Sequence, residues 1–240
     1  MYVAAFRGMI ITFDRYSAKT KTQLSSMQLS LQGVIPVPLR EKVEAYQSGM
    51  WKTTRSFNKG EYLFIQAPSG TGKTTLIHTL YGLRKDYEGN VMWGGQGLKN
   101  IDNELLAKLR TKNISVIFQD MRLFPELTAW ENIEIKRRLT NTVSIEQATM
   151  WLERLGLKDK MNSLGSTMSY GEQQRVAIVR ALLQPFEWLL MDEPFSHLDI
   201  ANTQKAIDLI AEVVAQHNAG MIVADLDENN YFPYTQKIIL

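Results

Sequence analysis

Residues 67–75, Ala-Pro-Ser-Gly-Thr-Gly-Lys-Thr-Thr, stand between a short apolar run, 63–67, and a helical pattern that begins at Lys73. The small residues of such a loop let backbone N–H groups close on an anion, and the N-terminus of the following helix adds its positive dipole end. This strand–loop–helix context predicts a nucleotide phosphate-binding loop in an α/β fold.

Two side chains of this loop have expected roles. Lys73 would neutralise the β- and γ-phosphates, and Thr74 would bind magnesium. Ala67 stands where glycine is usual, and a left-handed backbone there would cost alanine about 1–2 kcal/mol. We expect the whole loop to contact the nucleotide: Ala67, Pro68, Ser69, Gly70, Thr71, Gly72, Lys73, Thr74 and Thr75.

Asp192 and Glu193 follow the four apolar residues 188–191. A buried strand that delivers two carboxylates to its exposed end is costly unless a cation or a reacting group meets them. Asp192 therefore suits the magnesium shell, and Glu193 suits a base that orients and deprotonates the attacking water.

Short apolar runs at 63–67, 114–118, 188–191, 221–223 and 237–240 alternate with helical patterns, which is typical of buried parallel strands. Residues 27–39 look extended, and Pro36 and Pro38 favour an edge strand. A helix is expected from a cap at Asp199 to an end at Gly220. Only helical patterns follow Gln119, which predicts a separate helical lobe at about 120–169, whereas 1–26 show no firm periodicity and are expected to be an extension.

The composition excludes some classes. Across 240 residues, 27 basic and 25 acidic side chains leave a formal charge of +2, which argues against nucleic acid as a partner. There is no cysteine, and no run approaches the roughly 18–20 apolar residues of a membrane span. We expect a cytoplasmic protein whose work at a membrane would need a second polypeptide.

Further motifs follow in a fixed order. Residues 169–182 begin Ser-Tyr-Gly-Glu-Gln-Gln-Arg, 116–119 read Val-Ile-Phe-Gln, and 196–199 read Ser-His-Leu-Asp. With the phosphate loop, the set resembles the ATP-binding subunit of an ABC transporter over residues 27–240. These segments are similar to its signature motif, Q-loop and D-loop, and 123–132 resemble the helical segment that meets the membrane partner. The lipoprotein-release, cell-division and macrolide-efflux group is the most similar in character.

The resemblance implies a P-loop NTPase of ABC type, with a mainly parallel sheet, a helical lobe and a small antiparallel β portion. It also implies an ATPase with ATP and Mg²⁺ as cofactors, in which Gln119 serves both catalysis and the metal. In a head-to-tail homodimer, Lys73 of one copy and Ser169 of the other would hold one γ-phosphate. An integral membrane, permease-type subunit would hold the dimer at the inner face of the membrane. Further nucleotide contacts would come from Gly171, Glu172 and Asp199.

Two departures from the family pattern bear on activity. Tyr170 replaces a glycine that usually lies close to the phosphate. Ala224 replaces a histidine that contacts the γ-phosphate, and losing one preorganised group of this kind typically costs about 10²–10³ in rate. We therefore expect slow or partner-dependent hydrolysis.

The aromatic side chain that stacks on adenine is not evident, and Tyr46 and Trp51 are candidates. Of the three histidines, only His197 is placed to reach the site of an opposite copy; His78 and His217 are expected to be structural.

Two other functions stay open at this point. An ATP-gated regulatory clamp that dimerises but hydrolyses little is favoured by Ala224 and disfavoured by the intact Glu193 and Asp199. A DNA-associated ABC ATPase would need a coiled coil or a basic face, and the sequence has neither pattern.

Overall fold

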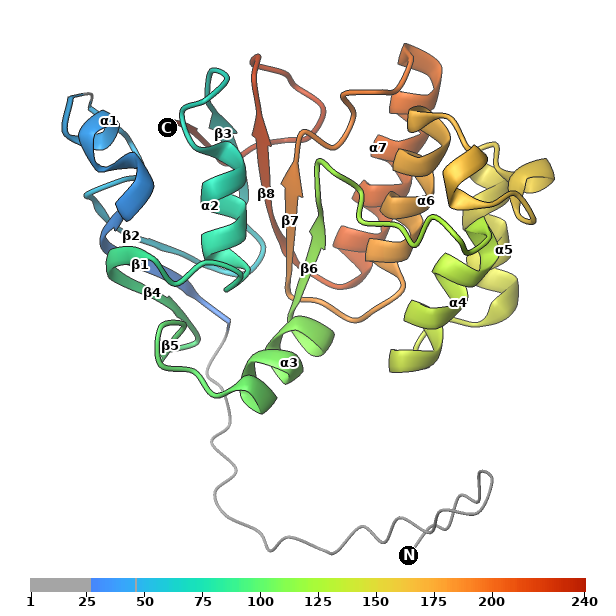
Figure 1. Cartoon of the computed structure of the whole chain (residues 1–240), viewed down its shortest axis with the longest axis horizontal. Helices are drawn as coiled ribbons and strands as arrows, with labels where there is room; N and C mark the ends of the chain where they lie inside the picture. The colour runs from blue at the N-terminus through green and yellow to red at the C-terminus, as the bar shows by residue number, and fades with distance from the viewer. Residues whose placement is uncertain (1–26, 46) are drawn as a thin grey trace, which may run out of the picture.

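The computed structural model describes residues 27–45 and 47–240, and two β-sheets form the frame of that part (Figure 1). A five-stranded sheet has the order β6-β7-β8-β3-β9 with every neighbouring pair parallel, and a four-stranded antiparallel sheet has the order β2-β1-β4-β5. The strands are β1 (Leu29–Pro36), β2 (Thr54–Phe57), β3 (Tyr62–Gln66), β4 (Tyr87–Trp93), β5 (Gln96–Gly97), β6 (Ile114–Ile117), β7 (Trp188–Asp192), β8 (Gly220–Asp225) and β9 (Gln236–Ile239). The predicted extension, 1–26, lies outside the described residues.

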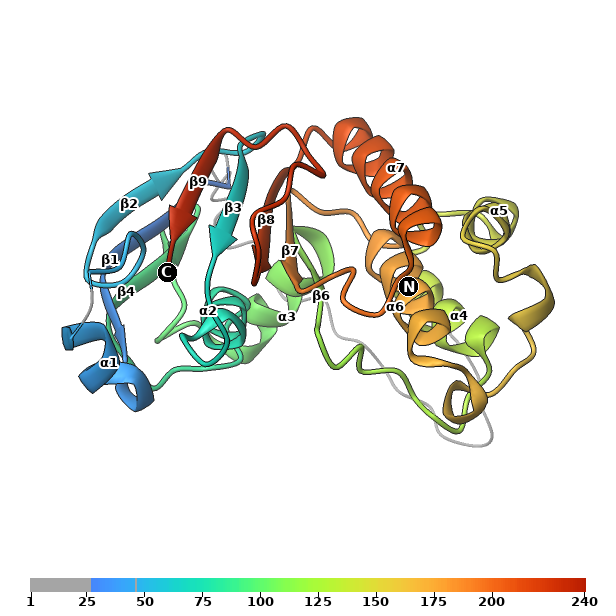
Figure 2. The same ribbon diagram turned by 90° about the horizontal axis from the view of Figure 1, so that it is seen from above.

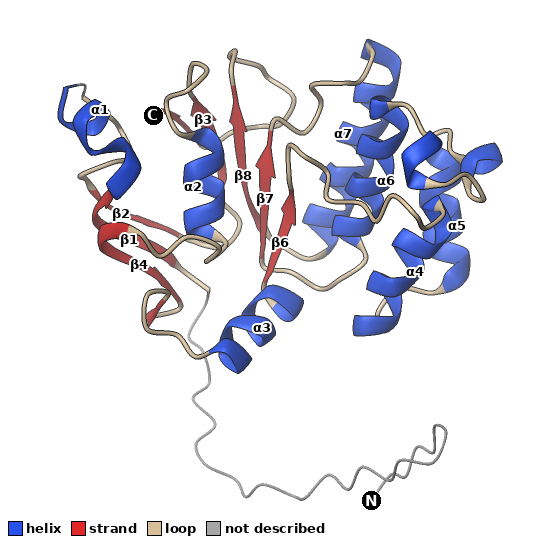
Figure 3. Cartoon of the chain, viewed as in Figure 1, coloured by secondary structure: helices blue, strands red, loops and turns tan. Residues whose placement is uncertain are grey.

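Helices cover both faces of the parallel sheet (Figures 2 and 3). The helices of the described residues are α1 (Arg40–Ala45), α2 (Lys73–Leu80), α3 (Asn103–Lys112), α4 (Ala129–Thr140), α5 (Ile145–Arg154), α6 (Tyr170–Leu182) and α7 (Ile200–Gln216). α2 and α3 lie on one face of the parallel sheet and α6 and α7 on the other, whereas α4 and α5 pack on α6 and α1 lies beside β1. Short 3-10 helices span Val37–Leu39, Lys158–Lys160 and Gly165–Thr167.

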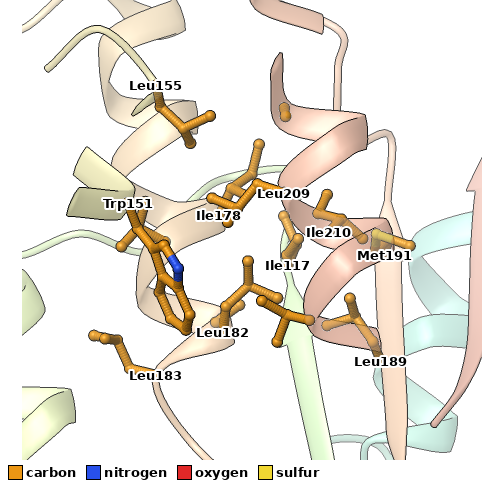
Figure 4. Packing of buried hydrophobic residues seen from close by; sticks show 14 of the residues in the cluster. Ile117, Trp151, Leu155, Ile178, Leu182, Leu183, Leu189, Met191, Leu209 and Ile210 are labelled. Atoms are coloured by element: carbon orange, nitrogen blue, oxygen red, sulfur yellow. The ribbon is translucent and has the colours of Figure 1, made fainter. Parts of the chain in front are cut away.

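Alternation along the strands divides the core into two clusters. Leu63 and Ile65 of β3 pack with α2 and the antiparallel sheet, whereas Phe64 faces the cluster that includes residues of α5, α6 and α7. Figure 4 shows part of the cluster that contains Phe64. Trp151 of α5, Ile178 of α6 and Leu209 of α7 pack together there. The parallel sheet therefore separates α2 from α6 and α7.

The five predicted parallel strands are present within one or two residues of their expected ends, but β9 at the edge of the sheet is partly exposed rather than buried. The edge-strand prediction for 27–39 is wrong. β1 pairs with β2 on one side and β4 on the other, so it is interior. Pro36 is its last residue and Pro38 lies in the 3-10 helix that follows, so neither proline removes a donor from the middle of the ladder. The register of the β1–β4 pairing shifts between Gln32 and Ile35.

The predicted end of the last helix is also corrected. α7 does begin at its Asp199 cap, but it ends at Gln216, before Asn218 adopts a left-handed φ of 46°. Gly220 instead opens β8, where an added Cβ would lie 2.8 Å from the Trp188 ring. The glycine is needed there for close packing rather than for helix termination.

The segment between β6 and α6 contains α4, α5 and turns, with one isolated antiparallel bridge between Thr128 and Leu164. Among the described residues, no helix is both long and apolar enough to cross a membrane.

Candidate functional site

The phosphate loop joins β3 to α2 at the carboxyl end of the parallel sheet. Gly70 and Gly72 have φ of 77° and 114°, values that suit glycine, and Gly72 is the residue before the first turn of α2. Ala67 is fully buried, donates its N–H to the Asp225 carbonyl at 3.0 Å, and is absent from the described non-glycine residues with positive φ. Alanine at this position therefore carries no left-handed strain.

Lys73 is almost completely buried at the start of α2. Its Nζ donates to the Ala67 carbonyl at 2.9 Å and lies 3.3 Å from Oε1 of Glu193. These contacts hold a cation inside the loop, where phosphate oxygens would meet it.

A chain of side-chain hydrogen bonds connects three separate segments at this edge of the sheet. The Thr74 hydroxyl donates to Oε1 of Gln119 at 3.4 Å, and Nε2 of Gln119 donates to Oε2 of Glu193 at 3.2 Å. The structure thus brings together the residues predicted for metal binding and catalysis.

Glu193 has a φ of 45°, in the left-handed region that is strained for a residue with a side chain. Its N–H donates to the Ala224 carbonyl at 2.9 Å, and its own carbonyl accepts from Nε2 of Gln174 at 3.2 Å. These bonds hold the carboxylate towards Lys73, and strain that the surroundings maintain in this way is typical of functional positions.

Asp192, the last residue of β7, is 1% exposed. Neither of its carboxylate oxygens has a hydrogen-bond partner among the described residues. The Thr74 hydroxyl is still near enough to favour the ionised carboxylate and so to limit the rise in the pKa of Asp192. Burial, reinforced by Glu193, raises the pKa of Asp192 to about 6.

The residues around Asp192 fit a magnesium ion. An unpartnered buried carboxylate, a hydroxyl and an amide oxygen are hard donors of the kind that Mg²⁺ prefers. The described residues contain no cluster of three or more His, Cys, Asp or Glu side chains that could hold a metal alone. Phosphate and water would therefore complete the shell, as is usual for Mg²⁺.

Position 224 does not face open space. Ala224 pairs with Asp192 in the sheet, is fully buried, and packs in the core cluster shared with Ile65 and Leu190. The next residue, Asp225, is only partly buried; burial raises its pKa, and the nearby Glu193 raises it further.

The start of α6 is closed by a reciprocal pair of hydrogen bonds between Ser169 and Glu172. Ser169 accepts from the Glu172 N–H at 3.3 Å, and Glu172 accepts from the Ser169 N–H at 2.8 Å. Tyr170 is 67% exposed and stacks on His197 at 5.4 Å between ring centroids. Gly171 is required where it stands, because an added Cβ would lie 2.7 Å from the His197 carbonyl.

These signature residues do not join the phosphate loop within one copy, since α2 and α6 pack on opposite faces of the sheet. Asp199 caps α7 by accepting from the Asn202 N–H at 2.8 Å, close in sequence to His197. The site predicted from sequence is therefore divided between two surfaces.

The base-binding side differs from the sequence expectation. Trp51 is 2% exposed, so its ring is not free to stack on adenine, and Tyr46 lies outside the described residues. Instead, Leu39 reaches the position that a Cβ of Gly72 would occupy, and Lys42 donates to the Gly70 carbonyl at 3.0 Å. The sequence prediction placed Leu39 in an extended segment and left 40–60 without an assignment, so it missed both contacts.

The two remaining histidines have structural surroundings. His78 packs edge-on against Phe118, and His217 against Phe186. Burial lowers the pKa of both imidazoles, which keeps them neutral at pH 7.

Beside Gln119 lies a cleft of about 300 Å³, between β6 with its following loop, α4 and α6. Phe124, Ile135 and Leu139 line it, and their side chains are 51%, 43% and 68% exposed. Such a group of exposed apolar side chains is typical of an interaction surface.

The model of the ABC transporter family matches residues 52–196. "Uncharacterized ABC transporter ATP-binding protein YbbA" of Escherichia coli K12 is 38% identical over 70% of this chain and 75% of that protein. "Lipoprotein-releasing system ATP-binding protein LolD" of Buchnera aphidicola is 35% identical over 73% of this chain and 78% of that protein.

Two solved structures of MJ0796 have the same fold. One is described as a dimeric bacterial ABC transporter cassette; it is 28% identical, with a TM-score of 0.70 over 83% of this chain and 88% of that one. The other is a dimeric post-hydrolysis state bound to ADP and Pi, which is 27% identical with a TM-score of 0.69 over the same shares.

Proposed function

This chain belongs to the ABC transporter family, and we propose that it is an ATP-binding subunit that hydrolyses Mg-ATP at a head-to-tail dimer interface. The observation that carries the proposal is the hydrogen-bond chain from Thr74 through Gln119 to Glu193, beside buried Lys73 and the unpartnered carboxylate of Asp192. Loop, metal ligands and base meet at one edge of the sheet, as phosphoryl transfer requires.

In this proposal the loop amides of 67–75 and Lys73 bind the phosphates. Thr74, Gln119 and Asp192 hold Mg²⁺, which would neutralise the charge on the β- and γ-phosphates when bound. Glu193 now pairs with Lys73 at 3.3 Å. A γ-phosphate would compete for Lys73, and Glu193 would then be free to orient water and accept its proton.

The second half of each site would come from another copy. Ser169, Gly171, Glu172 and Asp199 lie at the exposed starts of α6 and α7 and have no phosphate to meet within their own copy. An exposed helix N-terminus is suited to an anion, so two-fold pairing would complete two sites. The dimeric MJ0796 structures support this arrangement.

An integral membrane, permease-type subunit is the proposed mechanical partner, with this chain at the inner face of the membrane. The cleft beside Gln119, lined by Phe124, Ile135 and Leu139, is suited to contact it. Gln119 belongs both to the hydrogen-bond chain of the site and to the loop that borders this cleft, so closure around nucleotide would move the cleft. The named LolD relative favours the lipoprotein-release, cell-division and macrolide-efflux group.

We propose that hydrolysis is slow or depends on the partner. Asp225 places a third acid near Glu193 and Lys73, and an ionised carboxylate there would oppose the γ-phosphate charge. The same observation favours a second candidate function, an ATP-gated clamp that closes but hydrolyses little.

Steady-state phosphate release tests the proposal, measured on the purified protein and on its membrane complex. The wild type is expected to exceed a Glu193→Gln variant by at least about 10² in rate, as for loss of a general base. Equal rates for the two proteins in both settings would leave only the clamp. Light scattering of the Glu193→Gln variant with Mg-ATP should give a dimer; a monomer, even in the complex, would refute both functions.

A further inference from the structure

The cleft beside Gln119 has an unbalanced charge. Three basic residues line it, Arg122, Lys136 and Arg180, and its lining contains no acidic residue, although Asp120 outside the lining pairs with Arg122 at 3.2 Å. Phe124, Ile135 and Leu139 are exposed in the cleft, so a bound partner would contact both apolar side chains and positive charge. An occupant with complementary charge is favoured in such a cleft.

Of the three basic residues that line the cleft, Lys136 is the one whose charged group has no partner among the described residues. Within the described part of the chain, its amine forms no hydrogen bond and no ion pair, and it is half-buried. The next two residues contrast with it, since Arg137 and Arg138 both pair with Glu134 at 2.6 Å. The sequence thus supplies an acid to Arg137 and Arg138 and none to Lys136.

Arg180 makes the position of Lys136 less favourable still. Its guanidinium is fixed by donation to the carbonyls of Met121 and Arg122 and forms no ion pair within the described residues. Burial and the charge of Arg180 together lower the pKa of Lys136. A half-buried cation beside a second cation is stabilised by an anion that arrives with a partner.

We propose that the membrane-subunit segment which docks in this cleft carries a carboxylate side chain that pairs with Lys136, flanked by apolar side chains that pack on Phe124 and Leu139. The inference rests on the proposed function, because it takes the occupant to be a protein segment of that subunit. An anionic lipid headgroup would pair with the charge equally well. It would not cover the three exposed apolar side chains of the cleft, whereas a protein segment would pack against them.

A zero-length carbodiimide tests this, because it joins an amine to a carboxylate only when the two are in contact. The full-length tagged chain is treated in native membranes and purified in mild detergent, and cross-linked peptides are identified by mass spectrometry. The wild type should yield Lys136 bonded to an Asp or Glu of an integral membrane protein. Lys136→Arg should keep the complex and lose this cross-link, since the guanidinium is not coupled.

A charge-reversal variant measures how much the pairing at Lys136 contributes to binding of the membrane protein. Lys136→Glu should reduce recovery of the same membrane protein by at least about tenfold, the effect of placing like charges in a contact. Lys205→Glu, the same change at an exposed position of α7, should leave recovery unchanged. Thermal unfolding of each variant confirms that it folds.

The inference requires both results. If Lys136→Glu retains the membrane protein, or if recovery falls while the wild type gives no Lys136–carboxylate cross-link, the inference is overturned and the proposed function stands. The second pattern would indicate an anion that is not a carboxylate, such as a lipid phosphate. If no integral membrane protein accompanies the wild type, the membrane coupling in the proposed function fails as well.

Discussion

Asp192 shows at the scale of one residue how a binding site can cost stability. Its carboxyl is buried without a hydrogen-bond partner among the described residues, and its pKa is raised to about 6 from an ordinary 3.8. A raised carboxyl pKa means that ionisation is harder in the folded state than in the unfolded one. The penalty is therefore absent below about pH 4 and complete above about pH 6.

We expect Asp192→Asn to stabilise the nucleotide-free, metal-free protein at pH 8, because it removes a charge that is buried without a partner. The gain in free energy of unfolding should be on the order of 1–3 kcal/mol at pH 8 and should shrink towards zero at pH 4. Urea unfolding in EDTA at both pH values measures it. A loss of stability at pH 8 would show that Asp192 is already paired.

The placement of Asp192 and Glu193 at the end of a fully apolar strand was predictable from the local sequence. Their roles beside a cation and a reacting water stay predictions. The left-handed backbone of Glu193 was not predictable, because the Ala224 carbonyl that holds it comes from another strand. Lys42 was missed for a similar reason, since its contact with Gly70 depends on how 37–45 fold back on the loop.

At the scale of elements, α4 and α6 begin with the same device. Thr128 and Ser169 each cap a helix with the side-chain hydroxyl, and each donates its own backbone N–H to the carboxylate of a glutamate three residues later. The caps differ in what they face, since only the cap at Ser169 is proposed to meet a nucleotide. The two helices therefore allow helix stability to be separated from nucleotide binding.

We expect Ser169→Ala and Thr128→Ala each to lower the free energy of unfolding by about 1 kcal/mol, the usual cost of losing a cap. Only Ser169→Ala should also weaken Mg-ATP-dependent dimerisation, because its hydroxyl and amides would contact the γ-phosphate. Urea unfolding and sedimentation in the Glu193→Gln background measure the two effects. If both variants dimerise equally well, Ser169 does not contact the nucleotide.

The elements that sequence predicted well are the buried parallel strands, because a strand covered on both faces is apolar throughout. β1 was misassigned because its place in a sheet depends on which distant strands pair with it, and prolines report only on the chain locally. Gly220 was misassigned as a helix end because the sequence does not reveal that Trp188 packs on it.

For the whole molecule, the decisive feature is the division of the site between two faces of one sheet. Lys73 and Glu193 lie at the carboxyl edge with α2, whereas Ser169 begins a helix on the opposite face. In the proposed function, one copy alone would therefore carry two incomplete sites. In a head-to-tail dimer, Glu193 of one copy and Ser169 of the other would serve the same nucleotide, and this makes subunit mixing informative.

Mixing two inactive variants tests that arrangement. A Glu193→Gln chain and a Ser169→Arg chain should each be inactive alone, because every site in either homodimer has one defect. In the mixed dimer both defects fall in one site, and the other site is intact. Since half of random dimers are mixed and each has one good site, phosphate release should recover to about one quarter of the wild-type value. If both residues served the same copy, no site would be intact and mixing would restore nothing.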